Sequence, residues 1–332
     1  MATCIGRREF MTLVGSAAAW PPAACAQQRV RTVGVLLGLG SNDSEIQARI
    51  SAFELGLEVL GWTLRRNLRI EYRFAESDVG RMRTLGKELV DLHPDVILAH
   101  STAVTTAILQ ATRTVPTVFV VVSDPVGSGF VASMARPGGN ATGFTNHAST
   151  ISGKFLDLLR RIAPGVSRVA LMFNPNTATF AESFYLRPFL TAAASLAIDP
   201  TAALVHDGSD IERIIAALGS EPGGGLIVVP DNFTTVNRKV IIALAARHHV
   251  PAIYPYRYFC DDGGLMAYGV DLIDVFRRAA SYVDRILKGA RPADLPVQSP
   301  TKFEFVINMK TANALGLTVL QILRTSVDAV IE

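Results

Sequence analysis

The stretch from Thr117 to Gly143 constrains the fold more than any other part of this 332-residue chain. It opens with Thr-Val-Phe-Val-Val-Val, a β-branched and aromatic run without polar alternation. Such a run is typical of a strand that is covered on both faces inside a parallel sheet. Ser123-Asp124-Pro125 then ends the strand with two polar side chains and a proline that cannot donate to a ladder. Because open α/β sheets bind ligands beyond the carboxyl ends of their strands, functional residues are expected here.

Strand and helix patterns alternate along the rest of the chain in the same way. Before this strand we expect strands over residues 31–37, 68–74 and 96–99, and helices over 44–60, 79–92 and 102–111. After it we expect helices over 151–162, 180–196, 210–218, 234–248 and 272–288. The accompanying strands are expected over 168–173, 201–205, 225–229, 252–254, 265–268 and 303–308. This order predicts parallel sheets covered by helices.

Turn-forming residues divide the alternation into two lobes. Residues 136–140, Arg-Pro-Gly-Gly-Asn, are dense enough in turn chemistry to stop one domain, and residues 141–144 are expected to be an extended crossing. The helix after Asp271 is expected to return to the first lobe, and residues 295–300 to cross a third time. The predicted fold is therefore α/β, with two doubly wound parallel-sheet lobes and a three-crossing hinge. The expected lobes are residues 29–143 plus 271–295, and residues 144–270 plus 300–332.

Composition excludes several classes of protein. Hydrophobic residues make up 49% of the chain and charged residues 18%, which is too apolar for a disordered chain. Beyond the N-terminus, no apolar run is long enough to span a bilayer, so we expect a soluble mature protein. The formal net charge is +3 without a block of Lys and Arg, so no nucleic-acid partner is expected.

Residues 1–26 have the pattern of an export signal. Arg7-Arg8 lies in a charged segment, an apolar segment runs to Trp20, and Ala24-Cys25-Ala26 is an A-x-A cleavage site. The leader resembles a twin-arginine signal, so we expect cleavage before Gln27 and a periplasmic protein. A lipid anchor at Cys25 is the less favoured outcome, because the usual leucine of a lipoprotein box is absent. Cys260 then stays alone in the mature chain, as a small semi-buried side chain without a disulfide partner.

Motifs for catalysis, metals and cofactors are missing or incomplete. Residues 38–43, Gly-Leu-Gly-Ser-Asn-Asp, follow a strand as a dinucleotide fingerprint does, but Asp43 occupies the position of the third glycine. The six histidines show no metal-ligand spacing. No nucleophile lies in a pattern with a base. We therefore expect no cofactor, no metal and no enzyme activity.

Polar residues after strand ends are the remaining candidates for a binding site. Each group taken singly is also consistent with an ordinary loop, but their joint placement between two lobes describes a clamshell. The groups are Ser101-Thr102, Ser123-Asp124, Asn174, Asp231-Asn232, and Tyr268 with Asp271.

The expected ligand is a small polar solute with an aromatic or apolar part, and amino acids are the leading class. Ser101, Thr102 and Ser123, with backbone N–H groups at helix starts, are expected to bind a carboxylate. Asp231, or Asp124 or Asp271 near the hinge, would pair with an ammonium group. The remaining candidates are Phe233, Tyr254 and Tyr268, which would cover the solute's side chain, and Asn174, which would hydrogen-bond across the gap. The alternative for Asp124 and Asp271 is that they only brace hinge loops.

Several segments resemble the ABC-transporter substrate-binding proteins of the tryptophan/tyrosine-binding type. The matching segments are residues 7–10 of the leader, 123–126 (Ser-Asp-Pro-Val), 136–143 (Arg-Pro-Gly-Gly-Asn-Ala-Thr-Gly), 173–175 (Phe-Asn-Pro) and 300–304 (Pro-Thr-Lys-Phe-Glu). The resemblance implies a type I periplasmic-binding fold, capture of a solute outside the cytoplasmic membrane, and delivery to a membrane permease with an ATPase partner. We expect a monomer. The competing classes are an enzyme on a doubly wound fold, such as a dehydrogenase, and a sensor related to repressor ligand domains.

Overall fold

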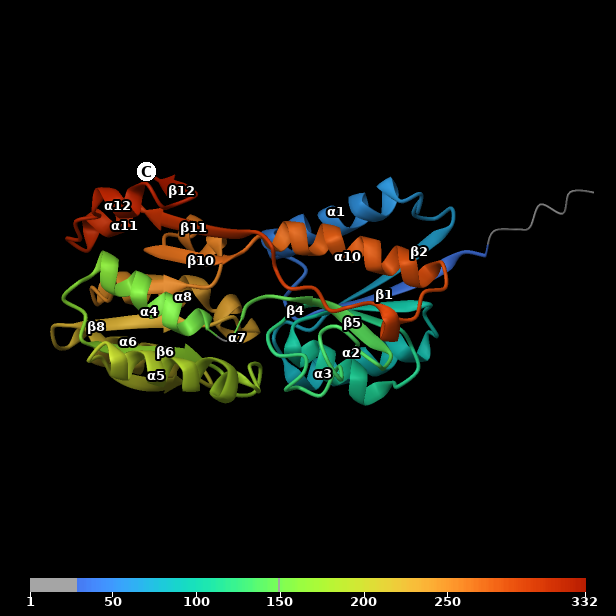
Figure 1. The fold of residues 1–332 in the computed structure, drawn as a ribbon, viewed down its shortest axis with the longest axis horizontal. Coiled ribbons are helices and arrows are strands. Elements are labelled where there is room, and N and C mark those ends of the chain that lie inside the picture. Colours follow the sequence, from blue (N-terminus) through green and yellow to red (C-terminus); the bar gives the residue numbers. More distant parts are fainter. Residues whose placement is uncertain (1–28, 149) are drawn as a thin grey trace, which may run out of the picture.

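The structure is a computed structural model that describes residues 29–148 and 150–332. The export signal predicted over residues 1–26, including Cys25, lies outside the described residues. The described chain forms two lobes side by side, each built on its own sheet (Figure 1). We call the part built on the five-stranded sheet lobe one and the part built on the seven-stranded sheet lobe two. The predicted α/β class with two lobes is confirmed.

The sheet of lobe one is parallel throughout and has the strand order β2-β1-β3-β4-β5. Its strands are β1 (Arg31–Leu37), β2 (Leu68–Phe74), β3 (Val96–His100), β4 (Thr117–Val122) and β5 (Ala141–Thr145). Its helices are α1 (Ser44–Val59), α2 (Val79–Asp91), α3 (Thr102–Ala111) and α10 (Leu272–Leu287), with the short η2 (Pro292–Asp294). Helices α1 and α10 pack together on one face of the sheet, and α2 and α3 cover the other (Figure 1).

Strand β4 is the continuous apolar run from which the fold was predicted. All six of its residues are buried, and it pairs with β3 on one side and β5 on the other. Residues 141–144 were expected to form the crossing between the lobes, and this prediction is wrong. They belong to β5, in which Gly143 has a φ of 156° and approaches the Phe119 carbonyl so closely that a Cβ atom would lie 1.9 Å from it. The chain leaves lobe one only after Thr145.

The sheet of lobe two has the order β12-β11-β10-β9-β8-β6-β7, and β11 runs antiparallel to β10. Its strands are β6 (Arg168–Phe173), β7 (Asp199–Leu204), β8 (Gly224–Val228), β9 (Ala252–Tyr254), β10 (Met266–Val270), β11 (Phe303–Asn308) and β12 (Ala329–Ile331). Its helices are α4 (Ile151–Ile162), η1 (Glu182–Leu186), α5 (Arg187–Ser195), α6 (Gly208–Gly219), α7 (Asn232–Val236), α8 (Arg238–Arg247), α9 (Arg257–Asp261), α11 (Met309–Ala314) and α12 (Gln321–Arg324).

Alternate residues of β6 enter the two hydrophobic layers of lobe two. Val169 and Leu171 pack in the layer formed with α4 and α5, whereas Ala170 and Met172 pack in the layer formed with α6 and α8. A strand covered on both faces in this way has no polar side, which is why the sequence pattern over residues 168–173 identified it. The short elements α9, η2 and β12 were not predicted, because segments of three to five residues carry too little periodicity.

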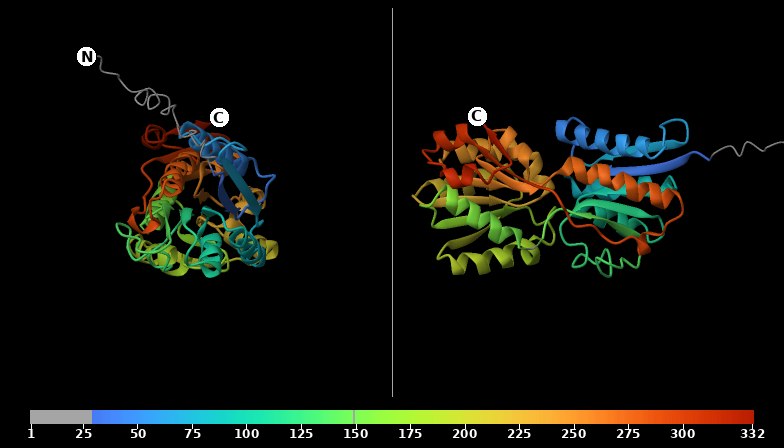
Figure 2. Two further views of the ribbon diagram at one scale, coloured as in Figure 1. Left: turned by 90° about the vertical axis from the view of Figure 1, so that its right-hand side faces the viewer. Right: turned by 45° about the horizontal axis from the view of Figure 1, so that its top comes forward.

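The chain passes between the lobes three times, as predicted. It crosses after β5, between β10 and α10, and after Gln298 on its way to β11. The first and third crossing segments are hydrogen-bonded to each other, since the Thr145 amide donates to the Gln298 carbonyl at 2.9 Å. The second view of Figure 2 shows the crossing segments meeting between the two lobes. Three adjacent connections of this kind form a hinge about which the lobes can close.

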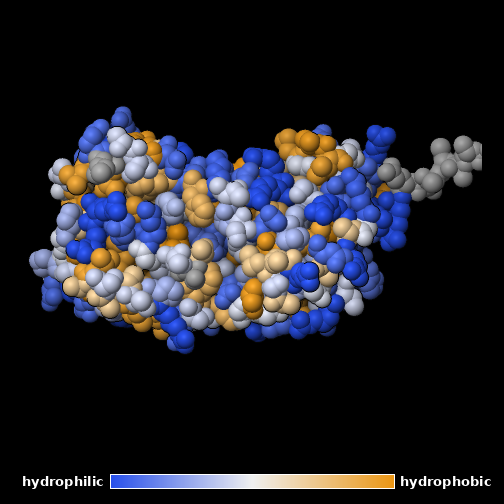
Figure 3. All heavy atoms as spheres, in the orientation of Figure 1, coloured by the Kyte–Doolittle hydropathy of each residue, from blue (hydrophilic) through white to orange (hydrophobic). Residues whose placement is uncertain are grey.

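Polar and apolar side chains are mixed over the visible surface, with an apolar area on the upper side of lobe one where α1 lies (Figure 3). Helix α1 exposes Leu55 by 56% and Val59 by 84%, while its buried face includes a charged residue, Arg49, that is 1% exposed. The burial of this helix therefore does not follow hydrophobicity alone. Over the parts of the chain that are described, no helix combines the length and apolar character needed to cross a membrane.

Candidate substrate-binding site

A cavity lies between the two lobes. Its empty space is about 550 Å³, a figure that includes the space open to solvent. Lobe one contributes residues after β1, β3 and β4 and from the start of α10, together with Arg49. The lobe-one residues are Leu39, Arg49, His100, Ser101, Thr102, Val121, Ser123 and Leu272. Asn146 comes from the first crossing, and lobe two adds Thr177, Ala178, Phe180, Ala181, Tyr185, Pro230, Asp231, Asn232, Thr235, Tyr256 and Tyr258.

The wall in lobe one contains two residues in unusual backbone conformations. Ser101, the N-cap of α3, has a φ of 84°, and Val121 has a φ of 60° where the pairing of β4 with β5 shifts register. A positive φ is uncommon outside glycine and is a genuine outlier for a β-branched residue. Such strain is concentrated at functional sites, where the surrounding structure maintains it. Both residues line the cavity, so the strained backbone indicates a functional site at this end of the sheet.

Hydroxyl groups of this wall already have protein partners. The Ser101 Oγ accepts a hydrogen bond from the Asn232 Nδ2 at 2.9 Å, and the Thr102 Oγ1 accepts one from the Ser123 amide at 3.3 Å. The Ser123 Oγ shares a hydrogen bond of 2.7 Å with the Tyr185 Oη and accepts one from the Asn146 Nδ2 at 3.3 Å. Two of these contacts join lobe one to lobe two. The hydroxyls therefore contribute to closure of the cleft.

Asp231 is the carboxylate of the wall in lobe two. Its oxygens accept hydrogen bonds from the Thr177 Oγ1, from the Asn174 amide at 2.8 Å and from the Phe233 amide at 3.0 Å. Burial nevertheless raises the pKa of Asp231 to about 6, against the opposite effect of these hydrogen bonds. The Thr234 amide acts on the carboxylate in the same way and also lowers its pKa. The Asp231 carboxylate is ionised at neutral pH and only weakly solvated.

Tyrosines supply the aromatic surface of the cavity. Tyr185, Tyr256 and Tyr258 line it, and the Tyr256 Oη accepts a hydrogen bond from the Asn146 Nδ2 at 3.4 Å. The rings of Tyr256 and Tyr258 are stacked, with 5.6 Å between centroids. Burial raises the pKa of all three hydroxyls, so they remain neutral hydrogen-bonding groups. This surface suits a flat or apolar part of a ligand.

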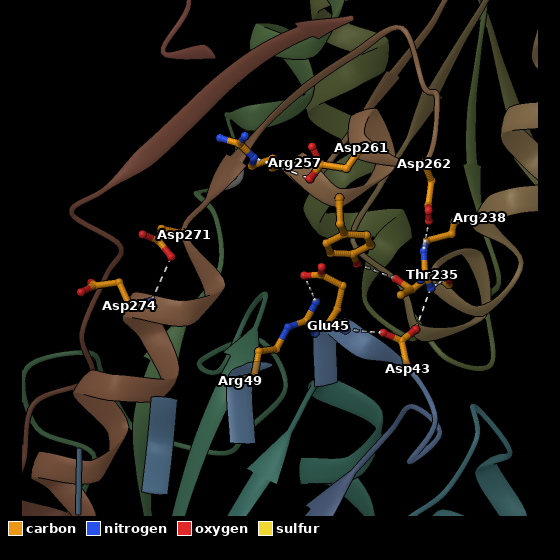
Figure 4. Close-up of polar contacts among 11 residues, drawn as sticks. Asp43, Glu45, Arg49, Thr235, Arg238, Arg257, Asp261, Asp262, Asp271 and Asp274 are labelled. Atoms are coloured by element: carbon orange, nitrogen blue, oxygen red, sulfur yellow. Dashed lines mark hydrogen bonds and ion pairs between the residues drawn. The ribbon is translucent and has the colours of Figure 1, made fainter. Parts of the chain in front are cut away.

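A second group of charges lies outside the cavity and joins the lobes. The Arg238 Nη1 of lobe two is 2.7 Å from the Asp43 Oδ2 of lobe one, and the Arg238 Nε is 2.7 Å from the Asp262 Oδ2 (Figure 4). We call this group of Arg238, Asp43 and Asp262 the rim contact. Its side chains are 11%, 14% and 27% exposed, and Asp43 and Arg238 line a separate surface hollow. The rim contact and the Ser101–Asn232 hydrogen bond hold the described conformation closed.

Gly38 explains part of the glycine motif that resembled a dinucleotide fingerprint. A Cβ atom at this position would lie 2.2 Å from the Asn232 Nδ2, so the absence of a side chain lets the loop after β8 approach lobe one. The amide of Gly38 donates to the His100 Nδ1 at 3.4 Å. A larger residue here would displace the Asn232 side chain from its present position between the lobes.

The structure brings five of the eleven predicted site residues to the cavity and places the other six elsewhere. The five are Ser101, Thr102, Ser123, Asp231 and Asn232. The six are Asp124, Asn174, Phe233, Tyr254, Tyr268 and Asp271.

Two of the six carry out loop bracing. Asp124 accepts a hydrogen bond from the Gly127 amide at 2.8 Å within its own loop. Asp271 caps α10 by accepting from the Asp274 amide at 3.0 Å and pairs with Lys302 at 2.5 Å. This geometry corresponds to the alternative stated for them, in which they brace hinge loops.

The other four lie behind the cavity wall or away from it. The Asn174 side chain accepts from the amides of Asn176 and Thr177, while Phe233 packs against the core and its amide orients Asp231. Tyr254 is buried and stacked on the Phe259 ring at 5.0 Å. Tyr268 stacks on Phe303 at 5.7 Å, beside a different surface hollow. Strand-end position alone did not indicate which way these side chains point.

Sequence reasoning missed most of the remaining cavity lining, and one omission had a signal. Arg49 lies on the same helical stripe as Ile46, Ile50 and Phe53, so a charge interrupts the apolar face of α1. A charged residue at such a position needs a partner or a function. By contrast, Asn146, Tyr185 and Tyr256 reach the cavity only through the closed arrangement of the lobes, for which the sequence carries no periodic signal.

Within the described ranges, no group of three or more His, Cys, Asp or Glu residues is arranged to hold a metal ion. Cys260 is fully buried, and its Sγ donates to the Val306 carbonyl at 3.8 Å. The polar and aromatic groups that line the cavity are hydroxyls, amides, aromatic rings, the His100 imidazole, one carboxylate and the Arg49 guanidinium.

A sequence model of the family described as ABC transporter substrate binding protein matches residues 37–331. The chain belongs to this family. Members are the extracytoplasmic components that bind a small-molecule solute for an ABC transporter, and this membership favours the solute-binding class over the enzyme alternative.

Known relatives of this ABC transporter substrate-binding protein cover most of its length. A "Tyrosine-binding protein" of Clostridioides difficile (strain R20291) is 24% identical over 265 residues, which are 80% of this chain and 75% of the relative. A conserved domain protein from Vibrio cholerae has a similar structure, with a TM-score of 0.84, 24% identity, and coverage of 91% of this chain and all of the other. An ABC domain solved in complex with L-Trp from Streptococcus pneumoniae gives a TM-score of 0.82 at 22% identity, with the same coverage. These structures share the predicted fold.

Proposed function

We propose that this substrate-binding protein captures an amino acid with an aromatic side chain in the cavity between its lobes and presents it to the permease of its ABC importer. The observation that carries the proposal is the buried Asp231 carboxylate beside the three cavity tyrosines. A desolvated ammonium group needs an anionic partner, and an aromatic side chain needs apolar surface. The relatives named for tyrosine binding and solved with L-Trp support the same class of solute.

In this proposal Asp231 binds the ammonium group. Tyr185, Tyr256 and Tyr258 cover the side chain of the solute, and Asn146 contributes the carbonyl oxygen of its side chain, which has no hydrogen-bond partner among the described residues. Ser101, Thr102, Ser123 and Asn232 complete the wall and connect the lobes around the solute. The protein then acts by hinge closure and carries out no turnover.

A thermal-shift screen followed by titration calorimetry tests the proposal. L-Tyrosine, L-tryptophan, other amino acids and small carboxylates are added to the chain that lacks residues 1–26. A ligand present at about 100 times its dissociation constant adds about 2.7 kcal/mol to the free energy of unfolding. We expect the aromatic amino acids to give the largest shifts. If sugars or dicarboxylates raise the melting temperature of the protein and amino acids do not, the proposed solute class is wrong.

A pair of variants tests the role of Asp231. Asp231→Asn is expected to weaken L-tyrosine binding about 100-fold while 3-(4-hydroxyphenyl)propionate, which lacks the amine, binds as it does to the parent. Asp124→Asn is the matched control, since Asp124 lies outside the cavity, and it should leave both affinities unchanged. Equal losses for both ligands would refute the ammonium role. Adding nicotinamide cofactors and assaying for turnover checks the enzyme alternative.

We also propose that the protein reaches the periplasm through its twin-arginine-like leader. The support is Arg7-Arg8 followed by an apolar segment and Ala24-Cys25-Ala26. Cell fractionation and sequencing of the mature N-terminus test this. A start at Gln27 is the expected result, a lipid-modified start at Cys25 would indicate an anchored protein, and a cytoplasmic protein that begins at Met1 would overturn the proposal. We propose a monomer, which size-exclusion chromatography with light scattering tests.

A further inference from the structure

The most unusual group at the cavity is the guanidinium of Arg49. The side chain is 1% exposed and projects from the buried face of α1 into the region between the lobes (Figure 4). Its Nε and Nη2 atoms have no hydrogen-bond partner among the residues that the structure describes. A buried charge is normally paired and hydrogen-bonded, because removing it from water is otherwise very costly.

The residues around Arg49 do not accept hydrogen bonds from its Nε and Nη2 atoms. Glu45 is the one carboxylate paired with it in the described chain, and the Nη2–Oε2 separation of 3.8 Å is too long for a hydrogen bond. The ring of Tyr258 lies 5.2 Å from the Arg49 Cζ, and a side-chain hydrogen bond with Arg49 acts to lower the pKa of Tyr258, but Nε and Nη2 have no hydrogen-bond partner among the described residues. His100 cannot compensate, because burial and then the Arg49 charge lower the pKa of its imidazole to about 3. The guanidinium therefore retains unused donors in a low-dielectric site.

Arg238 provides an internal comparison. It lies over the same Tyr258 ring, at 5.3 Å, yet its Nε and Nη1 donate to Asp262 and Asp43 at 2.7 Å each. Stacking on this tyrosine thus does not prevent an arginine from donating hydrogen bonds to two carboxylates. The unused donors of Arg49 are a property of its position at the cavity.

We infer that Arg49 binds the carboxylate of the solute. The Nε and Nη2 atoms form one edge of the planar guanidinium, and two parallel N–H donors on one edge match the two oxygens of a carboxylate. Of the hydroxyls that the sequence suggested for this role, Ser123 already shares a hydrogen bond with Tyr185, and Ser101, which accepts from Asn232, offers one O–H donor where the guanidinium edge offers two. The inference rests on the proposed function, and it makes the cavity bipolar: Arg49 of lobe one binds the carboxylate, and Asp231 of lobe two binds the ammonium group.

Two variants and two probes test this assignment by calorimetry. Arg49→Met removes the charge with little change in size, and Arg238→Met does the same to the second arginine on Tyr258. L-Tyrosine carries the carboxylate, and tyramine lacks it. We expect the parent to prefer L-tyrosine at least 100-fold. Arg49→Met should weaken L-tyrosine about 100-fold and leave tyramine within about threefold, which abolishes the preference. Arg238→Met should weaken both probes equally.

A retained preference for L-tyrosine in Arg49→Met would overturn the inference and assign the carboxylate to another group, such as the start of α3. Arg49→Lys sharpens the result, because a point charge cannot reproduce two parallel donors and should restore only part of the preference. Circular dichroism of each variant checks folding.

The melting temperature of the ligand-free protein gives a readout that does not depend on the solute. A cation reserved for a ligand destabilises the empty protein, so Arg49→Met should melt at the same temperature as the parent or higher. A drop of about 4 °C or more would assign Arg49 a structural role and contradict the inference. If the parent binds none of the amino acids, the proposed function fails, and this melting temperature still decides whether Arg49 is a structural or a ligand-binding cation.

Discussion

The cavity and the rim contact hold two arginines against one tyrosine ring, and their electrostatic states are opposite. Arg238 at the rim has a carboxylate from each lobe at 2.7 Å, whereas Arg49 at the cavity has two nitrogens without a hydrogen bond to the described residues and is less exposed. The rim contact is satisfied without a ligand and so favours the closed conformation by itself. In the inference drawn for Arg49, the hydrogen-bond donors at the cavity gain an acceptor when a carboxylate enters. Affinity therefore combines a closure term, set at the rim, with a recognition term, set at the cavity.

The largest expected effect comes from reversing the charge at the rim. Arg238→Glu places a third carboxylate beside Asp43 and Asp262, and like charges at such distances cost several kcal/mol in a partly buried site. We expect L-tyrosine and tyramine to bind about 100-fold more weakly, without a change in their ratio. Lys239→Glu is the matched control, since Lys239 is exposed and outside the rim contact. Asp43→Asn in the same background should restore part of the affinity.

A change of the L-tyrosine to tyramine ratio in Arg238→Glu would show that rim and cavity are not separable. Calorimetry with both probes measures this ratio directly.

The cavity is expected to respond to pH and the rim is not. Burial raises the pKa of Asp231 to about 6, so in the ligand-free protein this carboxyl takes up a proton as pH falls below 6. Binding of an ammonium group needs the ionised form, and affinity for L-tyrosine should fall about tenfold per pH unit below 6 and stay constant above 7. Calorimetry between pH 5 and pH 8 checks this, and Asp231→Asn should abolish the dependence.

The raised pKa of Asp231 has the opposite effect on stability: rising pH favours ligand binding but lowers the free energy of unfolding. The unfolded chain holds this proton less tightly, with a pKa near 3.8, so the contribution of Asp231 to stability declines as pH rises from about 4 to 6. A stabilising contribution that grows over this range would contradict the burial of Asp231. Urea unfolding of the parent and of Asp231→Asn at several pH values measures the contribution of Asp231 to the free energy of unfolding.

A smaller effect is expected where the two lobes approach most closely. Gly38→Ala adds a Cβ atom 2.2 Å from the position of the Asn232 Nδ2, which must move or hold the lobes apart. We expect about tenfold weaker binding of L-tyrosine, since overpacking costs roughly 1–3 kcal/mol and part of it is relieved by rotation of Asn232. Gly40→Ala in the same loop is the control, because its Cβ would meet Glu76 at an ordinary 3.5 Å. Equal affinity for the two variants would mean that closure does not depend on this contact.

The smallest expected difference between the rim contact and the cavity is in the salt dependence of L-tyrosine binding. The rim contact is partly exposed and should be screened, whereas the buried Arg49 should be little affected. Raising NaCl from 0.05 to 1 M is expected to weaken L-tyrosine binding about threefold in the parent and not in Arg238→Met. If Arg49→Met, and not Arg238→Met, loses the salt dependence, the assignment of the two regions is reversed.

The hydrophobic periodicity of the sequence predicted most of the helices and strands. The features that it did not predict depend on how the two lobes pack together. A continuous apolar run such as Thr117–Val122 indicates by its composition alone that the strand is buried, so such strands were predicted within a residue or two. Residues 141–144 were misassigned because an edge strand beside a glycine-rich turn has the same composition as an extended connection. At the site, Ser101 and Asp231 were found because each follows the carboxyl end of a strand, one in the sheet of each lobe. Tyr256 and Tyr258 were missed because α9 is too short to show a pattern.

The path of the chain through α10 limits how this protein can be divided. Strands β10 and β11 are antiparallel neighbours, with Val270 opposite Phe303, yet the segment between them travels into lobe one and back. A single cut in the gene therefore cannot yield two complete halves, and a fragment ending near Thr145 would lack α10, which packs beside α1 on its sheet. A short turn in place of residues 271–302 would instead close the β10–β11 pair as an ordinary hairpin. Lobe two would then be one contiguous segment that recombination could transfer as a unit.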